Sequence, residues 1–437
     1  MTAPSPGGVS TGRGAATRVL ARLADIRAGL EDLYRDLHRH PELSHQERRT
    51  AALVAERLRA LDVETHEAVG GTGVVGLLRH GEGPTVLLRA DMDGLPVREA
   101  SGLGYASNET GTDQAGQEVP VMHACGHDVH VACLLGAAEL LARGRDDWSG
   151  TVMLVFQPAE EVGDGARAMV EGGLARLVGP VSVALAQHVL PGPAGTVATR
   201  EGPAFAAADS LRITVFGRGS HGSMPQASVD PVVLAAMIVI RLQTIVAREA
   251  RPGEPVVLTV GSVRAGTKSN VIPDHATLQL NLRTYDDATR TRVLAAVTRI
   301  VDAECQASGS PQPATYELFD QFPLTTNDPR ATARIAAAFA EQFGDAAGPL
   351  PLMMGSEDFT DLPRALGAPS CYWGIGGTDP AAYDAARRAG RIDQDIPVNH
   401  APNFAPVIQP TLDTGVRAMV TAALAWLAQP AADESAG

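Results

Sequence analysis

Residues 151–161 read TVMLVFQPAEE, an apolar run that ends in a glutamine, a proline and two adjacent glutamates. Apolar runs without alternation are typical of strands buried on both faces, as in a parallel sheet. Similar runs lie at residues 85–89, 181–186 and 371–375. Helical patterns lie around them, at residues 18–40, 45–61, 129–143, 166–177 and 328–344. The sequence therefore predicts an α/β fold, with a mixed, mostly parallel sheet and helices on both faces.

Polar side chains follow three of these predicted strands where each strand ends. Asp91 and Asp93 follow the run 85–89, Glu160 and Glu161 follow 151–156, and His188 follows 181–186. Because sites of such sheets lie beyond the carboxyl ends of the strands, we expect these side chains at one edge. Adjacent carboxylates repel each other unless a cation compensates them. On an extended backbone they would point in opposite directions, one toward a metal and one toward water or substrate.

A second signal is the stretch HACGHDVH at residues 123–130, with three imidazoles, a thiol and a carboxylate in eight positions. These side chains bind borderline divalent metals. The helix predicted after them would anchor the stretch in the core through Val131, Leu134, Leu135 and Ala138. We therefore expect a metal site at the sheet edge, with Cys125 and His127 as ligands and with His123 and His130 in supporting positions.

From about residue 204 the pattern changes to strand, helix, strand, strand, helix, at residues 210–216, 230–250, 256–260, 276–284 and 286–308. This order predicts a compact α+β unit inserted into the α/β domain at residues 199–312. The α/β domain would then comprise residues 18–198 and 313–430, with flexible tails at 1–17 and 431–437.

Composition excludes several classes of function. The net charge of −14 argues against nucleic-acid and anionic-membrane binding. The four cysteines form no CxxC pair, so reduced thiols are expected. The first residues lack the apolar core of a signal peptide, and the longest apolar run, 232–240, is too short to span a bilayer, which favours a cytoplasmic protein. The stretch GTGVVG at 71–76 matches a dinucleotide fingerprint, but a predicted hairpin follows it instead of a helix. The sequence therefore argues against nucleotide binding.

Several segments, taken in order, resemble the M20 metallopeptidase family, and within it the amidohydrolase branch of aminoacylase, hippurate hydrolase and auxin-conjugate hydrolase types. The segments are LHRHPEL (37–43), RADMDGLP (89–96), MHACGHDVH (122–130), FQPAEE (156–161), HGSMP (221–225), DP (230–231), SNVIPD (269–274), MGSEDF (354–359) and HAPNF (400–404). They cover about residues 30–410. The resemblance implies a di-metal exopeptidase-like fold whose inserted unit is a ferredoxin-like lid.

The resemblance also implies the site residues. Two divalent ions, Zn²⁺, Mn²⁺ or Co²⁺, would be bound by five side chains and bridged by the cysteine. These ligands would be Cys125, His127, Glu161, His188 and His400. Glu160 would be the general base, Asp93 would orient a ligand, and His221 and Asn270 of the lid would contact the substrate. Whether His221 acts within its own subunit or across a homodimer formed through the lid stays open.

The function implied is hydrolysis of the amide bond of small N-acyl amino acids. A dipeptidase or carboxypeptidase of the same family is an alternative, in which the acyl group is itself an amino acid. A non-catalytic relative is a third possibility, but it would be expected to have lost Glu160 or a metal ligand, and all are present.

Overall fold

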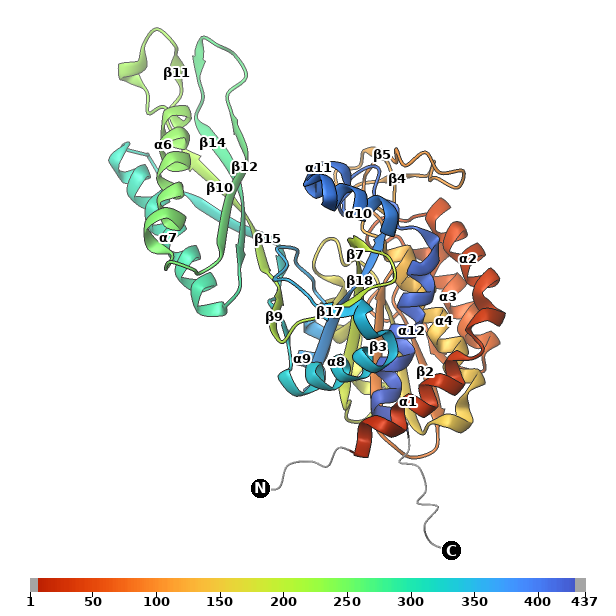
Figure 1. Ribbon diagram of the computed structural model, residues 1–437. Coiled ribbons are helices and arrows are strands. Elements are labelled where there is room, and N and C mark those ends of the chain that lie inside the picture. Colours follow the sequence, from red (N-terminus) through yellow and green to blue (C-terminus); the bar gives the residue numbers. More distant parts are fainter. Residues whose placement is uncertain (1–6, 429–437) are drawn as a thin grey trace, which may run out of the picture. The chain divides into compact units, whose positions relative to one another are not determined.

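The computed structural model describes residues 7–428, and the chain divides into two compact units (Figure 1). The first unit runs from the first described residue to Ala204 and includes Thr326–Leu352 and the chain from Asp358 onward. The second unit contains Phe205–Thr325 and Met353–Glu357. The expected tail 431–437 lies outside the described residues. The expected tail 1–17 does not hold from Gly7 onward, because helix α1 (Gly7–Leu20) buries Ala15, Ala16 and Val19.

The first unit is built on an eight-stranded sheet in the order β1-β2-β6-β3-β7-β18-β8-β17. The central strands β6, β3, β7 and β18 run parallel, and β1, β2 and β8 each pair antiparallel with a neighbour. The predicted α/β fold with a mostly parallel sheet is confirmed. The strands are β1 (Glu64–His66), β2 (Val74–His80), β3 (Thr85–Asp91), β6 (Gly150–Gln157), β7 (Val183–Pro193), β8 (Val197–Thr199), β17 (Ala347–Pro349) and β18 (Ser370–Thr378).

The hairpin predicted after the GTGVVG stretch is wrong. Strand β6 lies between β2 and β3, antiparallel to the first and parallel to the second. The β2–β3 connection passes over the start of β6, where Thr151 N donates to Pro84 O at 2.9 Å. A Cβ on Gly150 would lie 2.3 Å from that oxygen, so only glycine fits. The stretch still leads into a strand rather than a helix, so the structure lacks the helix that a dinucleotide site requires.

Helices cover both faces of this sheet (Figure 1). The helix predicted for residues 18–40 is split, because α1 ends at Leu20 and α2 starts at Leu23. Further helices are α2 (Leu23–Arg39), α3 (Arg48–Ala60), α4 (His127–Arg143), α5 (Gly165–Glu171), α8 (Pro329–Phe343), α9 (Asp361–Leu366), α10 (Pro380–Ala389), α11 (Ile392–Asp395) and α12 (Ile408–Leu427).

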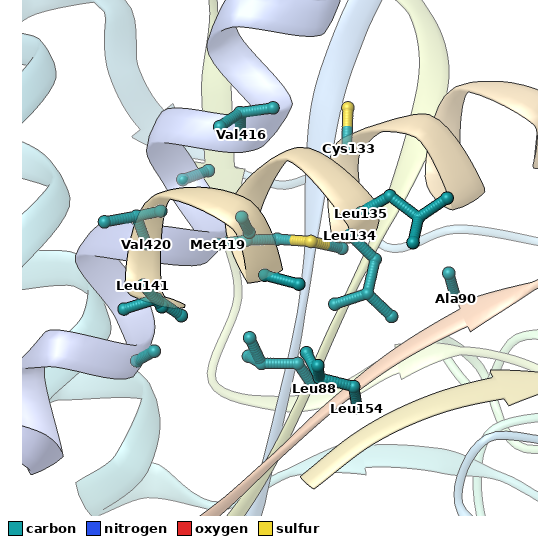
Figure 2. Close-up of a cluster of buried hydrophobic side chains, with 14 of the residues drawn as sticks. Leu88, Ala90, Cys133, Leu134, Leu135, Leu141, Leu154, Val416, Met419 and Val420 are labelled. Atoms are coloured by element: carbon teal, nitrogen blue, oxygen red, sulfur yellow. The ribbon is translucent and has the colours of Figure 1, made fainter. Parts of the chain in front are cut away.

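Helix α4 anchors the cysteine–histidine stretch in the largest hydrophobic core. Its Leu134 and Leu141 pack with Val416 and Met419 of α12 above Leu88 of β3 (Figure 2). All four predicted anchors of this helix are buried. The helix starts two residues earlier than predicted, directly after Gly126, whose φ of 82° is favourable for glycine. His127 is therefore fixed in the first helical turn.

The second unit has a four-stranded antiparallel sheet in the order β12-β14-β10-β15, with helices α6 and α7 packed on it. The order β-α-β-β-α-β is the predicted ferredoxin-like arrangement. Strand β15 lies beyond the expected boundary at 312, and its half-exposed position at the sheet edge gave little apolar signal in the sequence. The elements are β10 (Ala207–Phe216), α6 (Pro231–Thr244), β12 (Val256–Ala265), β14 (His275–Thr284), α7 (Asp287–Ala307) and β15 (Thr315–Phe322).

The apolar segment of helix α6 and the turn after it is longer than the run 232–240 recognised in the sequence. The 19 residues Pro231–Glu249 are long and apolar enough to cross a membrane by length and composition alone, and 33% of an 18-residue apolar stretch within them is buried. Ile238 and Leu242 pack in the core of the second unit, as a core helix requires. On the opposite face Met237 and Ile240 are 48% and 65% exposed. The helix therefore carries one buried and one exposed apolar face.

Candidate metal centre

The carboxyl-end edge of the sheet collects the predicted ligands within the first unit. Cys125 and His127 lie at the start of α4, Glu161 follows β6, and His400 lies in the loop between α11 and α12. His188 does not follow a strand, as the sequence suggested, but lies inside β7 opposite Gly374 of β18. The strand continues past the histidine because β18 supplies a parallel partner for it.

The donor atoms of these five side chains form two overlapping groups. The first donor set contains Cys125, His127 and His188, and the second contains Cys125, Glu161 and His400. Within each set the donor atoms lie within 4.8 Å of one another. The sulfur belongs to both sets, 3.5 Å from His188 Nε2 and 3.3 Å from His400 Nε2. Glu161 Oε2 closes the second set at 3.4 Å from His400 Nε2.

Two atoms in these sets are buried and have no hydrogen-bond partner among the described residues, His127 Nε2 and Glu161 Oε1. They lie 3.8 Å apart. A buried polar atom without a partner destabilises the folded state. A divalent cation, coordinated by sulfur, nitrogen and oxygen, would satisfy both atoms. The residues present therefore fit two divalent metal ions.

Hydrogen bonds orient the two buried imidazoles for metal binding. His127 Nδ1 donates to Asp93 O at 2.9 Å and lies 3.2 Å from Asp93 Oδ1, which leaves the lone pair of a neutral ring on Nε2. His188 Nδ1 donates to Val189 O at 2.8 Å, with the same consequence. Asp93 Oδ2 also accepts from Glu161 N at 3.0 Å. Asp93 thus contacts two of the predicted ligands, an arrangement typical of residues that support a metal site.

In the metal-free protein burial dominates the pKa values of three predicted ligands, whereas for His127 the charge of Asp91 and further polar contacts together outweigh burial and raise the pKa well above its usual range. Desolvation raises the pKa of the Cys125 thiol to about 12, and the negative charge of Glu161 adds to the effect. Desolvation also raises the pKa of Glu161 to about 8. Burial lowers the pKa of His188 well below its usual range, so this ring is neutral. A bound cation would favour the thiolate and the carboxylate, so metal binding would release protons here.

Glu160 lies in a turn and not on extended backbone, which corrects the geometry assumed from the sequence. The preceding residue, Ala159, has a φ of 51°, and Gly163 N donates to Glu160 O at 2.9 Å. Glu160 Oε2 lies 3.9 Å from His127 Nε2, and Glu160, Glu161 and His127 form a further group of close donor atoms. The turn, rather than strand alternation, therefore brings both carboxylates to the donor sets.

Sequence reasoning missed Glu47, which holds this turn. Its buried carboxylate accepts from Ala159 N at 2.8 Å and from His45 N at 2.9 Å. Thr72 Oγ1 donates to its other oxygen at 2.5 Å. In the sequence Glu47 precedes a helix in a polar stretch, where an exposed residue is the ordinary expectation, so no signal identified it.

A buried network of charged side chains lies next to the two donor sets at the sheet edge. Arg89 donates to Asp91 Oδ2 at 2.5 Å and to Asp358 Oδ1 at 3.2 Å. Asp91 Oδ1 lies 2.5 Å from His130 Nδ1, and His130 Nε2 accepts from Val189 N at 2.9 Å. His130 is thus occupied by two partners outside the donor sets. The network links the end of β3 to the strand that carries His188.

His221 and Asn270 belong to the second unit, where the two-residue strands β11 (Ser220–His221) and β13 (Val271–Ile272) pair. Gly222 N donates to Asn270 O at 2.8 Å, and a Cβ on Gly222 would lie 3.1 Å from the Asn270 backbone. His221 Nδ1 accepts from Ser223 N at 3.1 Å. A neutral His221 therefore carries its hydrogen on Nε2 and can donate it, and the side chain is exposed.

Sequence reasoning also missed Arg283 on β14. Its guanidinium donates to Met354 O at 2.7 Å and to Asn281 Oδ1 at 3.1 Å. It forms no ion pair among the described residues, and burial lowers its pKa. An arginine in an alternating strand reads as part of a solvent face, which is why the pattern of residues 276–284 did not single it out. A half-buried cation without a carboxylate partner is a candidate anion-binding group.

An α/β sheet with overlapping Cys, His and carboxylate donor sets at its strand ends, in a chain that also contains a ferredoxin-like unit, is an arrangement suited to two-metal hydrolysis. The chain belongs to peptidase family M20/M25/M40, whose profile matches residues 87–396. The predicted family is thus confirmed, and the protein is a hydrolase of amide bonds.

Similar proteins span most of the chain. Thermostable carboxypeptidase 2 of Saccharolobus solfataricus is 38% identical, over 80% of this chain and 86% of its own. Hippurate hydrolase of Campylobacter jejuni is 35% identical, over 78% and 86%. A crystal structure of a dinuclear metal binding peptidase from the M20 family of Bacillus subtilis superposes with a TM-score of 0.72 and 29% identity, covering 92% of this chain and 98% of its own.

Proposed function

We propose that this protein hydrolyses N-acyl amino acids. Cys125, His127, Glu161, His188 and His400 would hold the two metal ions. The observation that carries the proposal is the pair of donor sets that share Cys125 Sγ, with the Glu160 carboxylate beside them. A hippurate hydrolase among the similar proteins supports the substrate class, because hippurate is an N-acyl amino acid.

Each group has a separate role in hydrolysis. When bound, the two cations lower the pKa of a water molecule and polarise the scissile carbonyl. The Glu160 carboxylate accepts a proton from that water as its oxygen attacks the amide carbon. The Nε2–H of His221, from the same or a partner subunit, would donate a hydrogen bond to the developing oxyanion. Glu160 then passes its proton to the leaving nitrogen as the amide bond breaks, which gives a carboxylic acid and an amino acid.

An N-acyl amino acid carries a carboxylate, which the net negative charge of the chain repels. Binding therefore requires a cationic side chain at the site. We assign this role to Arg283, with Asn270 as a second contact on the same unit. Replacing Arg283 by alanine is expected to raise KM by about 10- to 100-fold, the loss typical of a hydrogen bond to a charged group, with a small effect on kcat. Steady-state kinetics on an N-acyl amino acid and on its neutral amide measure this effect.

Arg212 is the matched control for that prediction. It lies on the neighbouring strand β10 and is paired with Glu317 at 2.5 Å. Arg212→Ala is expected to leave KM unchanged. An equal loss with the neutral amide substrate would contradict a carboxylate-binding role for Arg283.

We further propose a homodimer formed through the second unit. Its support is the exposed apolar face of α6 and the outer edge of β12, an edge strand of the sheet. The double variant Met237→Glu, Ile240→Glu is expected to be monomeric, because charges on this face would be buried unpaired in a dimer. Light scattering on the wild type should give twice the 45.5 kDa chain mass. The control is Thr291→Glu on α7, which should stay dimeric. A monomeric wild type would refute the dimer.

A carboxypeptidase or dipeptidase remains the second candidate, and the 38% identity to a thermostable carboxypeptidase favours it. A panel of N-acetyl amino acids, N-benzoyl amino acids and dipeptides, each assayed with Zn²⁺, Mn²⁺ and Co²⁺, separates the two functions. Higher kcat/KM on the N-acyl compounds supports the first function, and higher kcat/KM on dipeptides supports the second. No turnover on any member would refute both.

A further inference from the structure

His38, near the end of α2, is completely buried between two carboxylates. Its Nδ1 lies 2.7 Å from Asp128 Oδ2 and its Nε2 lies 3.0 Å from Glu99 Oε1. The side chains of Asp128 and Glu99 are 0% and 1% exposed. Because an ionised carboxylate can only accept, both ring nitrogens must carry hydrogen, and the ring is an imidazolium.

The charge state agrees with this geometry. Burial by itself lowers the pKa of His38, but the hydrogen bonds and negative charges of Asp128 and Glu99 outweigh it and raise the pKa to about 10. Two tyrosine rings flank the cation, with the centroids of Tyr34 and Tyr105 at 5.7 and 5.3 Å.

One carboxylate ties His38 to the start of α4. Asp128 directly follows His127, and its second oxygen accepts from Val129 N at 2.9 Å. Both oxygens of the Asp128 carboxylate are therefore held, one by His38 and the other by the backbone of Val129. Since Cys125 and His127 lie within three residues of it, the hydrogen bond from His38 constrains the segment that carries both.

The other carboxylate ties His38 to the loop that carries His400. Glu99 accepts from Ser107 N at 2.6 Å, and the next residue, Ala100, donates its N–H to Pro402 O at 2.7 Å. One turn before His38, Tyr34 donates to Pro406 O at 3.3 Å. The last turns of α2 thus hold two segments that are far apart in sequence.

We propose that His38 is a positioning residue, which as a cation between Asp128 and Glu99 sets the segment of Cys125 and His127 against the loop of His400. The inference rests on the proposed function for the identity of the metal ligands. None of the three residues donates to a metal itself. Their loss should therefore weaken metal binding by the 10- to 100-fold typical of groups that orient ligands.

The test is a titration of metal-free protein with Co²⁺, followed by the absorption of the cobalt–thiolate bond. His38→Gln is expected to raise the dissociation constants about 10- to 100-fold and to shift this absorption. The matched control is His40→Gln, two residues further on, whose partly exposed ring also bonds a carboxylate, Glu109 Oε1 at 2.7 Å. His40→Gln should leave the dissociation constants and the spectrum as in the wild type.

The outcomes separate positioning from general stability. If His38→Gln lowers the melting temperature but leaves Co²⁺ affinity and spectrum unchanged well below it, the proposal is wrong. If His38→Gln does not fold, Glu99→Gln decides, because it keeps the His38–Asp128 contact and loosens only the His400 loop. It should weaken one of two Co²⁺ sites about tenfold, and two unchanged sites overturn the inference. A wild type that binds no Co²⁺ would instead refute the proposed function.

Discussion

Glu160→Gln is expected to lower kcat by about 10²–10⁴-fold or more, the range for a positioned acid–base group. Glutamine has the shape of glutamate but cannot accept the proton of the attacking water. The turn should persist, because the Glu47 carboxylate still accepts from the backbone N–H of Ala159. Measurements of kcat at saturating substrate, with metal content determined on the same samples, check the result.

The control for this substitution is Glu171→Gln, at the exposed end of α5. It removes a carboxylate of equal size away from the donor sets and should leave kcat unchanged. Near-normal turnover of Glu160→Gln on every amide substrate would show that another group accepts the proton. Loss of metal together with loss of turnover would instead place Glu160 among the ligands.

Cys125→Ala is expected to impair both metal sites at once, because its sulfur belongs to both donor sets. Removing a ligand should weaken binding of each ion by more than the roughly 100-fold upper range for groups that only orient ligands. Turnover should fall with metal content. Metal analysis after desalting, with activity assayed over a range of added Zn²⁺, Mn²⁺ and Co²⁺, measures both effects.

Cys133→Ala provides the comparison on the same helix. Cys133 is also buried in α4, but it packs in the hydrophobic core and belongs to neither donor set. This variant should retain both ions. If Cys125→Ala also retains two ions and full activity, or if a chelator leaves the wild type unaffected, the two-metal proposal fails.

Local sequence was informative wherever burial leaves a simple pattern. Strands β3, β6 and β18 are buried along most of their length, so their apolar runs located them to within three residues. Strand β15, half exposed at a sheet edge, carries no such run and was missed. The same reasoning overlooked Glu47 and Arg283, because a polar residue in a polar or alternating context gives no sign that the fold buries it.

The sequence by itself determined the α/β class, the family and the polar side chains near the strand ends, because strand burial and motif chemistry are properties of neighbouring residues. Only the tertiary structure placed β6 between β2 and β3, turned Glu160 through the left-handed Ala159, and brought His400 to 3.3 Å from Cys125 Sγ across 275 residues of chain. These relations depend on packing between segments remote in sequence. The conformational preferences of neighbouring residues do not determine contacts between such remote segments. The buried hydrogen bonds of Glu47, Asp93 and His38 hold these segments together in the folded chain.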